Sequence, residues 1–315
     1  MKVLITGGAG FLGSNLCYSL IKLKSIDKIY CLDSLYTGRK SNIISLETNK
    51  KFEFIKHDIR KQIKLEVDCI FNLACPASPP KYQKDPFLTL DTCYHGTKNI
   101  LELAKKNNAI TFHASTSEIY GNPNINPQTE EYFGNTNCYG PRSCYDEGKR
   151  IAETLIFEYQ NKFNLKIKIG RIFNTYGPMM DKNDGRVISN FINQCINNKP
   201  ITIYGDGEQT RSFCFVDDLI KAMKLLCFSK KEIMSPINIG NNNETTIKSI
   251  AKKIKTKTNS SSEIIFLNKP IDDPHIRRPD ITKAYKYLNW KPIIKLDDGL
   301  DKTIKYFKSQ KKIIA

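Results

Sequence analysis

The segment Lys2-Val-Leu-Ile-Thr-Gly-Gly-Ala-Gly-Phe-Leu-Gly13 decides the fold of this chain. Its apolar start predicts a strand, and the residues that follow predict a helix over 11–23. Gly7, Gly10 and Gly13 stand between the two elements with the spacing G-x-x-G-x-x-G. In that context the first glycine allows a tight turn, the second lets backbone N–H groups approach a pyrophosphate, and the third permits close helix–strand packing. The segment therefore predicts a dinucleotide-binding unit.

Short apolar runs and helical patterns continue to alternate beyond this unit. Further strands are predicted at 28–32, 52–56, 69–73, 110–114 and 166–173, and long helices are predicted from Pro86 and from Tyr145 to Phe163. Strands that alternate with helices form a parallel, doubly wound α/β sheet. After about residue 176, Gly, Pro, Asn and Asp separate shorter elements. We expect a Rossmann domain at 1–175 and a smaller α/β substrate lobe at 176–315, with a strand at 236–240 that returns to the first domain.

The composition is that of a globular protein, with 40% hydrophobic and 26% charged residues. The sequence has no apolar run of about 18 residues, so we expect no membrane span. Glycines interrupt the apolar start and no small-residue cleavage site follows, which argues against a signal peptide and for a cytoplasmic location. The ten cysteines are scattered without a Cys-x-x-Cys pair, which predicts reduced thiols and no metal site.

The net charge of +17 raises the alternative of a nucleic-acid-binding protein. Only 9 of the 49 basic residues are Arg, and the Lys are spread along the chain with no basic stripe that contains aromatic residues. We therefore expect no nucleic-acid partner.

Asp33 ends the second predicted strand 20 residues after Gly13. A carboxylate there can bond both ribose hydroxyls and repel a 2′-phosphate, which favours NAD, although Arg39 and Lys40 nearby leave NADP open. Further cofactor contacts are expected where the first helix begins, after the third and fourth strands, and on the helix that follows Pro86. These are Phe11, Leu12, Asp58, Ile59, Leu73, Ala74 and Thr92.

Tyr145 and Lys149 are four residues apart and lie on one face of a predicted helix. An ammonium beside a phenol stabilises the phenolate, so this pair predicts a general base. Thr116, Ser117 and Glu118 follow the fifth strand, where open α/β sheets bind ligands. The hydroxyls can bond the same substrate oxygen and Glu118 can move a proton. The alternative interpretations are an exposed Tyr over a Lys stem and a helix-capping cluster.

The chain resembles the extended short-chain dehydrogenases from end to end, and several segments are similar to the UDP-glucuronate decarboxylase family in particular. These segments are Ala74-Cys-Pro-Ala-Ser-Pro-Pro80, Ser115-Thr-Ser-Glu-Ile-Tyr-Gly121, Arg142-Ser-Cys-Tyr-Asp-Glu-Gly-Lys-Arg150, Arg171-Ile-Phe-Asn-Thr-Tyr-Gly-Pro178, Asp184-Gly-Arg-Val-Ile-Ser-Asn-Phe-Ile192, Tyr204-Gly-Asp-Gly-Glu-Gln-Thr-Arg-Ser-Phe213 and Asp272-Asp-Pro-His-Ile-Arg-Arg-Pro-Asp-Ile281.

The resemblance implies a reaction and a role for each site residue. Tyr145 would take the proton of the sugar's 4-hydroxyl while the carbon-4 hydride passes to NAD, with Lys149 holding the ribose and the phenolate. The resulting ketone would allow carbon dioxide to leave, and the returning hydride would give UDP-xylose. Arg277 would guide the carboxylate. The implied contacts to the nucleotide sugar are Pro76, Asn174, Arg186, Tyr204, Arg211 and Arg277.

The resemblance also implies a homodimer, because relatives pair the helix after Pro86 and the Tyr145 helix across a four-helix interface. Two segments depart from the family pattern. Asp91-Thr-Cys93 stands where a Lys-Thr-Asn run is usual, and the segment through Met179 lacks the Arg that usually follows Gly-Pro. We expect Asp91 to place an anion near the anionic sugar. A 4,6-dehydratase, an epimerase and an oxidative decarboxylase that releases a UDP-4-keto-pentose remain alternatives.

Overall fold

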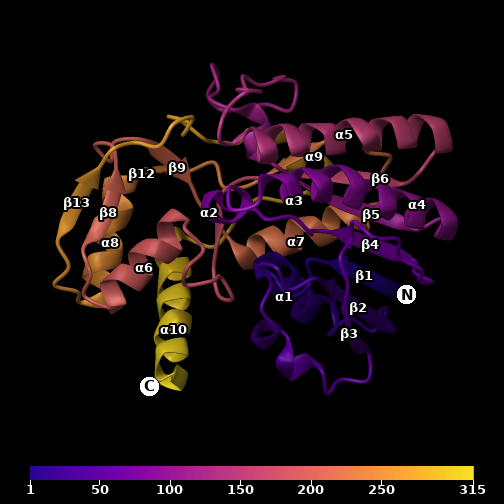
Figure 1. Cartoon of the computed structure of the whole chain (residues 1–315), viewed down its shortest axis with the longest axis horizontal. Coiled ribbons are helices and arrows are strands. Elements are labelled where there is room, and N and C mark those ends of the chain that lie inside the picture. Colours follow the sequence, from indigo (N-terminus) through magenta and orange to yellow (C-terminus); the bar gives the residue numbers. More distant parts are fainter. Residues whose placement is uncertain (315) are drawn as a thin grey trace.

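The structure is a computed structural model that describes the backbone of residues 1–314 and the side chains of residues 1–310. Its centre is a parallel sheet of seven strands in the order β11-β6-β5-β4-β1-β2-β3 (Figure 1). The strands are β1 (Lys2–Thr6), β2 (Lys28–Asp33), β3 (Phe52–Lys56), β4 (Cys69–Asn72), β5 (Ile110–Thr116), β6 (Ile167–Ile172) and β11 (Ile237–Ile239).

The sheet forms because its strands are apolar on both faces. Val3, Leu4 and Ile5 of β1 are fully buried, and they belong to two different hydrophobic clusters, one on each side of the sheet. Helices α1 (Phe11–Leu20) and α7 (Val216–Cys227) cover one face, and α4 (Thr97–Asn107) and α5 (Ser143–Phe163) cover the other (Figure 1). The predicted doubly wound α/β class is confirmed.

The predicted strands are all present. Those at 2–6 and 52–56 have the predicted ends, and the others differ by one or two residues. The predicted helix at 11–23 ends at Leu20, because the N–H of Leu23 bonds the carbonyl of Leu20 (2.9 Å) and turns the chain. The strand predicted at 236–240 is β11, which pairs in parallel with β6. The chain thus returns to the sheet after leaving it, and the division at residue 175 stays our proposal.

The predicted helix from Pro86 consists of three segments in the structure. Helix α3 (Pro86–Asp91) begins at Asp85, whose side chain accepts the N–H of Leu88 at 2.9 Å. A π-helical turn, η3 (Thr92–Gly96), follows, and α4 continues from Thr97. Gly96 lies against Ile59, so that a Cβ there would come within 2.5 Å of the Ile59 side chain. The π-helical turn therefore packs closely on the segment that follows β3.

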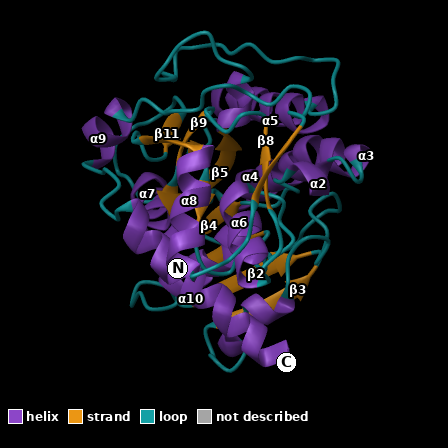
Figure 2. Ribbon diagram, turned by 90° about the vertical axis from the view of Figure 1, so that its left-hand side faces the viewer, coloured by secondary structure: helices purple, strands orange, loops and turns teal. Residues whose placement is uncertain are grey.

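The second lobe lies at one end of the sheet (Figures 1 and 2). Strand β8 (Ile201–Tyr204) pairs with β13 (Ile264–Leu267), and β9 (Thr210–Ser212) pairs with β12 (Glu244–Thr246). Its helices are α6 (Val187–Ile196), α8 (Ile247–Thr258) and α10 (Leu296–Ile314). The remaining short elements are α2 (Pro79–Tyr82), β7 (Thr175–Tyr176), β10 (Cys214–Phe215), α9 (Thr282–Leu288) and the 3₁₀ turns at Lys40–Asn42, Ile44–Leu46 and η4 (Ser117–Tyr120).

Within residues 1–314, no helix is both long enough and apolar enough to cross a bilayer.

Candidate active site

Two adjoining cavities lie where the carboxyl ends of the sheet strands meet the second lobe. The first has a volume of about 180 Å³ and is lined mainly by the segments that follow β1, β2, β3 and β4. The second has a volume of about 440 Å³ and is lined by the ends of β5 and β6, the start of α5 and the second lobe. Leu12, Leu73, Cys75, Ala77 and Arg186 line both cavities. The two cavities therefore share a wall.

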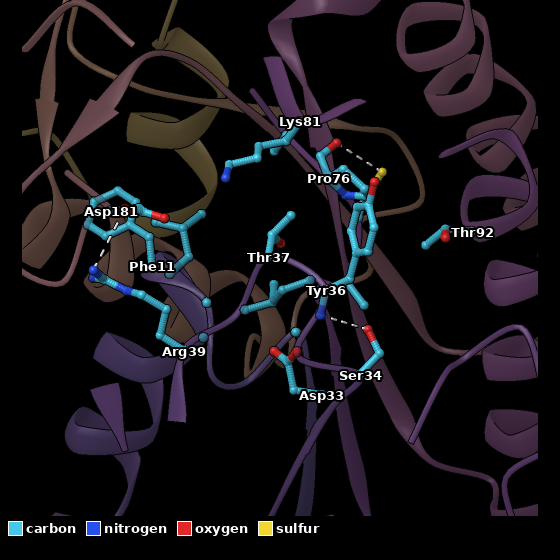
Figure 3. A pocket seen from close by; sticks show the side chains of 18 of the residues that line it. Phe11, Asp33, Ser34, Tyr36, Thr37, Arg39, Pro76, Lys81, Thr92 and Asp181 are labelled. Atoms are coloured by element: carbon cyan, nitrogen blue, oxygen red, sulfur yellow. Dashed lines mark hydrogen bonds and ion pairs between the residues drawn. The ribbon is translucent and has the colours of Figure 1, made fainter. Parts of the chain in front are cut away.

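The residues predicted at the glycine-rich turn and after the next three strands come together around the first cavity. Those that line it are Gly7, Gly10, Phe11, Leu12, Gly13, Asp33, Asp58, Ile59, Leu73, Ala74 and Thr92. Pro76, which the resemblance implied as a sugar contact, lines this cavity and not the second one. Figure 3 shows Pro76 and Thr92 on one side of the cavity, Asp33 at the end of β2, and Arg39 extending from the following segment toward Asp181.

The glycine turn has the geometry that a pyrophosphate requires. Gly7 has φ +64°, a left-handed conformation that glycine adopts without strain. A Cβ at Gly13 would come within 2.2 Å of the Gly7 carbonyl oxygen, so only glycine fits there. Gly10 caps the start of α1 without a side-chain hydrogen bond, which leaves the first helical N–H groups for an anion.

Asp33 is held in place by the backbone around it. Its carboxylate accepts the N–H of Ala9 at 3.0 Å on one oxygen and the N–H of Leu35 at 2.8 Å on the other. Burial raises the pKa of Asp33, while these two N–H groups act to lower it. Each oxygen keeps a lone pair for a further bond. The carboxylate is therefore oriented to accept ribose hydroxyls.

The two cations near Asp33 already have partners. The Arg39 guanidinium donates to the carbonyls of Met179 (3.2 Å) and Met180 (3.0 Å) and lies 3.8 Å from Asp181 (Figure 3). The Lys40 ammonium lies 3.3 Å from the Glu47 carboxylate. Both side chains are thus engaged by other groups of the protein, so the arrangement favours NAD.

The predicted catalytic residues meet in the second cavity. Tyr145, Lys149, Thr116, Ser117, Glu118 and Arg277 all line it. The Tyr145 ring is buried and stacks on the Tyr82 ring, with centroids 5.0 Å apart and planes 4° from parallel. One helical turn later, the Lys149 ammonium donates to the Ala114 carbonyl at 2.8 Å and lies 5.9 Å from the centre of the Tyr145 ring.

Tyr145 is a protonated phenol in this environment. Burial raises its pKa well above the usual value, the nearby Cys75 and Glu118 raise it further, and a hydrogen bond with Thr116 lowers it. We expected Lys149 to lower the pKa of Tyr145, but in the protein alone the opposite effect of burial is larger. A phenol that acts as a base here needs an additional positive charge close by.

Glu118 is paired with two guanidiniums. Arg277 binds it in a bidentate manner, with both N···O distances at 2.6 Å, and Arg142 binds the second oxygen at 2.6 Å. Burial opposes ionisation of Glu118, but Arg277 and Arg142 outweigh it and lower the pKa to about 2. Glu118 is therefore a carboxylate at neutral pH, a form that can accept a proton but has none to donate, and its expected role in moving protons stays a prediction.

The implied nucleotide contacts also line the second cavity, namely Asn174, Arg186, Tyr204 and Arg211. Two of them are bound to the protein itself. Arg186 forms a bidentate pair with Asp184. Arg211 donates to the Pro274 carbonyl at 2.7 Å and to Asp273 at 3.0 Å, and it thereby fastens the segment that carries Arg277.

One sequence-based expectation is wrong. Asp91 lines neither cavity: its side chain is half exposed and lies 3.9 Å from Arg60. It therefore adds no anion beside the sugar. Conversely, Arg142 was not predicted as a site residue. It lies at the start of the Tyr145 helix and appeared only as the first residue of the quoted segment Arg142–Arg150. Cys75, which lines both cavities, was not predicted either.

A dinucleotide cavity that opens onto a Tyr-x-x-x-Lys pair defines an NAD-type short-chain dehydrogenase/reductase. The family model described as GDP-mannose 4,6 dehydratase matches residues 4–303. The UDP-glucuronic acid decarboxylases 1 of Xenopus tropicalis and Arabidopsis thaliana are each 46% identical to the chain. They align over 98% of it and over 72% and 70% of their own lengths, respectively.

Solved structures agree with this likeness. The UDP-glucuronic acid 4-epimerase of Bacillus cereus, in complex with UDP-glucuronic acid and NAD, has a TM-score of 0.89 and 31% identity over 98% of this chain and 100% of the epimerase. The dTDP-glucose 4,6-dehydratase of Bacillus anthracis, in complex with NAD, has a TM-score of 0.87 and 26% identity over 99% and 98% of the two chains. The chain belongs to the epimerase/dehydratase family of extended short-chain dehydrogenases, together with the UDP-glucuronic acid decarboxylases.

We predict that Asp33→Ala weakens NAD binding by roughly 1–3 kcal/mol, the range for charge-assisted hydrogen bonds, because the ribose loses its carboxylate partner. Titration of the purified protein with NAD and NADP measures this. Asp68→Ala is the matched control, since Asp68 also accepts a backbone N–H, that of Lys2, but lines neither cavity. Equal affinities of the unmodified protein for NAD and NADP would contradict the prediction.

Proposed function

We propose that this protein is an NAD-dependent UDP-glucuronate decarboxylase that forms UDP-xylose and carbon dioxide, with the cofactor reduced and then reoxidised in place. The observation that carries the proposal is the meeting of Tyr145 and Lys149 with Arg277 in a cavity that adjoins the dinucleotide cavity. The likeness to decarboxylases at 46% identity over 98% of the chain supports the same reaction.

Tyr145 is the proposed base. It accepts the proton of the sugar's 4-hydroxyl, with Thr116 bonded to the phenol and Lys149 one turn away on the same helix face. Bound NAD supplies the hydride acceptor and the positive charge that the buried phenol lacks. Asp33 and the turn from Gly7 to Gly13 would hold it. The same phenol then returns the proton when the 4-ketone is reduced.

The decarboxylation step follows from the position of the ketone. A 4-ketone lies β to the carboxylate of a hexuronic acid, so the electrons of the breaking carbon–carbon bond pass to the ketone oxygen and form an enolate. Carbon 5 of this enolate then takes one proton from water, which restores the ketone before the hydride returns. The second cavity suits this anionic sugar. Its lining carries five positive charges, on Arg142, Lys149, Arg186, Arg211 and Arg277, and two negative ones, on Glu118 and Asp273, which leaves three net positive charges. We propose that Glu118 orients Arg277 toward the carboxylate and accepts a sugar hydroxyl.

The nearest alternatives are a dehydratase and an epimerase. A 4,6-dehydratase must expel the 6-hydroxyl with an acid, but Ser117 is a poor acid and Glu118 is held as a carboxylate. An epimerase on the same substrate has more support, because the Bacillus cereus enzyme is named for UDP-glucuronic acid. The two reactions differ in the mass of the product, because decarboxylation removes carbon dioxide and epimerisation leaves the mass unchanged.

Incubation of the purified protein with UDP-glucuronate, with products read by mass and NADH by absorbance, tests the function. We expect loss of carbon dioxide, a UDP-pentose product and no net NADH. A product of unchanged mass would indicate an epimerase, and a keto-pentose with accumulating NADH would indicate an oxidative decarboxylase. Either result, or no conversion, would contradict the proposal. Parallel incubations with UDP-, dTDP-, CDP- and GDP-linked sugars identify which nucleotide the enzyme accepts.

We predict that Tyr145→Phe lowers the turnover of UDP-glucuronate by roughly 10²–10⁴-fold or more, the range for a positioned acid–base group, because no group replaces the phenol oxygen. Tyr82→Phe is the control. It removes a buried hydroxyl that has no hydrogen-bond partner, but keeps the ring that stacks on Tyr145. Single-turnover formation of NADH absorbance locates the loss in the first hydride transfer. Undiminished turnover in Tyr145→Phe would refute the assignment.

We also propose a homodimer formed through α3 and α5. These helices lie side by side (Figure 1) and expose large apolar side chains, including Phe87 at 78% and Phe157 at 58% exposure. Leu90 and Ile151, on the same two helices, are exposed as well. A second copy of this pair of helices would bury the group in a four-helix arrangement. The cytoplasmic location expected from the sequence stays a prediction.

The double variant Phe87→Glu, Phe157→Glu should be monomeric, because it places charges in the apolar contact. Light scattering of the unmodified protein should give twice the chain mass of 36.1 kDa, and the variant should give the chain mass itself. Phe133→Glu is the matched control, since Phe133 is 89% exposed but lies on the segment between η4 and α5. An unmodified protein of one chain mass at micromolar concentration would count against the dimer.

A further inference from the structure

Two cysteines face each other in the wall that the two cavities share. Cys75 follows β4, and Cys93 lies in the π-helical turn η3; their sulfur atoms are 3.5 Å apart. Cys75 is partly exposed and lines both cavities, whereas Cys93 is buried behind it and lines neither. The proposed reaction uses neither thiol, so this pair needs a separate explanation.

The two cysteines are packed differently. Cys93 packs against the helix that carries Tyr145 and Lys149, since a Cβ added at Gly148 would lie 3.0 Å from the Cys93 sulfur. Cys75 is less confined, and its thiol donates to the Pro76 carbonyl at 3.4 Å. A disulfide has an S–S length of about 2.05 Å, so the two sulfurs must approach each other by only about 1.4 Å. Rotation of the Cys75 side chain is the motion that this approach requires.

The two thiols also differ in reactivity. The hydrogen bond with Cys93 lowers the pKa of Cys75 against the effect of burial, and Lys149 lowers it further. The same hydrogen bond and burial raise the pKa of Cys93. Because the thiolate is the nucleophile in thiol chemistry, Cys75 is the attacking member and Cys93 the thiol that resolves its oxidised form.

A second thiol pair is about equally close but differs in its access to solvent. The sulfurs of Cys69 and Cys227 are 3.6 Å apart, nearly the same distance, but both residues are buried in the core and line neither cavity. An oxidant in solution can reach Cys75 and cannot reach that pair. Bound metal is a poor explanation for the Cys75 site, because the described residues contain no group of three or more His, Cys, Asp or Glu side chains placed to hold an ion.

We propose that Cys75 and Cys93 form a reversible oxidation site at which a peroxide converts the two thiols into an intramolecular disulfide and stops turnover. The Cys75 thiolate attacks one peroxide oxygen, the O–O bond breaks, and sulfenic acid and water form. The Cys93 sulfur then attacks the Cys75 sulfur, and the hydroxyl of the sulfenic acid leaves as a second water with the Cys93 proton. Two thiols lose two electrons and two protons, and one peroxide is reduced to two waters.

The disulfide would affect the site through the shared wall. It ties residues 73–77, which line the cavities, to the π-helical turn beneath α5. The segment that holds the dinucleotide and the helix that carries Tyr145 then cannot adjust to their ligands independently. Because the dinucleotide would occupy the cavity onto which Cys75 opens, bound NAD should slow the oxidation. The disulfide itself can be tested even if the proposed function fails.

The experiment uses full-length protein with Cys138→Ser, because Cys138 is exposed and would form bonds between molecules. After hydrogen peroxide treatment we expect the intact mass to fall by two hydrogen atoms and peptide mapping to join Cys75 to Cys93. Activity and NAD binding should fall together and return with dithiothreitol, and NAD added beforehand should slow the reaction. A disulfide to Cys144, the third thiol nearby, would overturn the proposal.

Two variants separate the pair from general oxidative damage. Cys93→Ser should keep its basal activity but give a Cys75 sulfenic acid that dimedone traps, with no disulfide. Cys227→Ser should respond to peroxide as the parent does, because Cys227 and its neighbour Cys69 are both buried in the core. The proposal fails if peroxide inactivates the parent without any disulfide, or if the disulfide forms and turnover and NAD binding stay unchanged.

Discussion

The ion pairs of Glu118 with Arg277 and Arg142 are the interaction on which the second cavity depends. They join the turn after β5, the residue before α5 and a segment of the second lobe, which are far apart along the chain. Both guanidiniums are buried and Glu118 is mostly so, and a missing partner in a buried ion pair leaves an uncompensated charge at a cost of about 3–5 kcal/mol. The orientation of Arg277 therefore depends strongly on this carboxylate.

This constraint separates the tasks of the site. Because Glu118 is committed to two guanidiniums, we propose that proton transfer is left to Tyr145, whose buried phenol would need added positive charge beside it to act as a base. Substrate oxidation would thereby be coupled to cofactor binding. The remaining positive charge among the residues that line the second cavity favours a sugar that carries a carboxylate.

Local patterns were enough to predict most of the fold, most of the residues around the first cavity and the Tyr145, Lys149 and Thr116–Glu118 part of the second, whereas the other residues of the second cavity were implied by the family resemblance. The glycine turn, the strands and the Tyr145–Lys149 helix follow from short-range spacing, because strand and helix periods are properties of neighbouring residues. Contacts between distant segments could not be predicted in this way. Two such contacts depend on tertiary packing: the ion pair of Glu118 with Arg277, and the hydrogen bonds from Arg39 to the carbonyls of Met179 and Met180. The direction of Asp91 depends on which face of α3 meets the sheet, a choice that its sequence alone leaves open.

The central claim is that one bound cofactor removes and returns the hydride at a single sugar carbon. Its most direct test is to incubate the enzyme with UDP-glucuronate that carries deuterium at carbon 4, in the presence of excess unlabelled NADH, and to analyse both products by mass spectrometry and NMR. We predict that UDP-xylose keeps the deuterium at carbon 4 and that NADH in solution stays unlabelled. Loss of deuterium from UDP-xylose, or its appearance in free NADH, would contradict the claim.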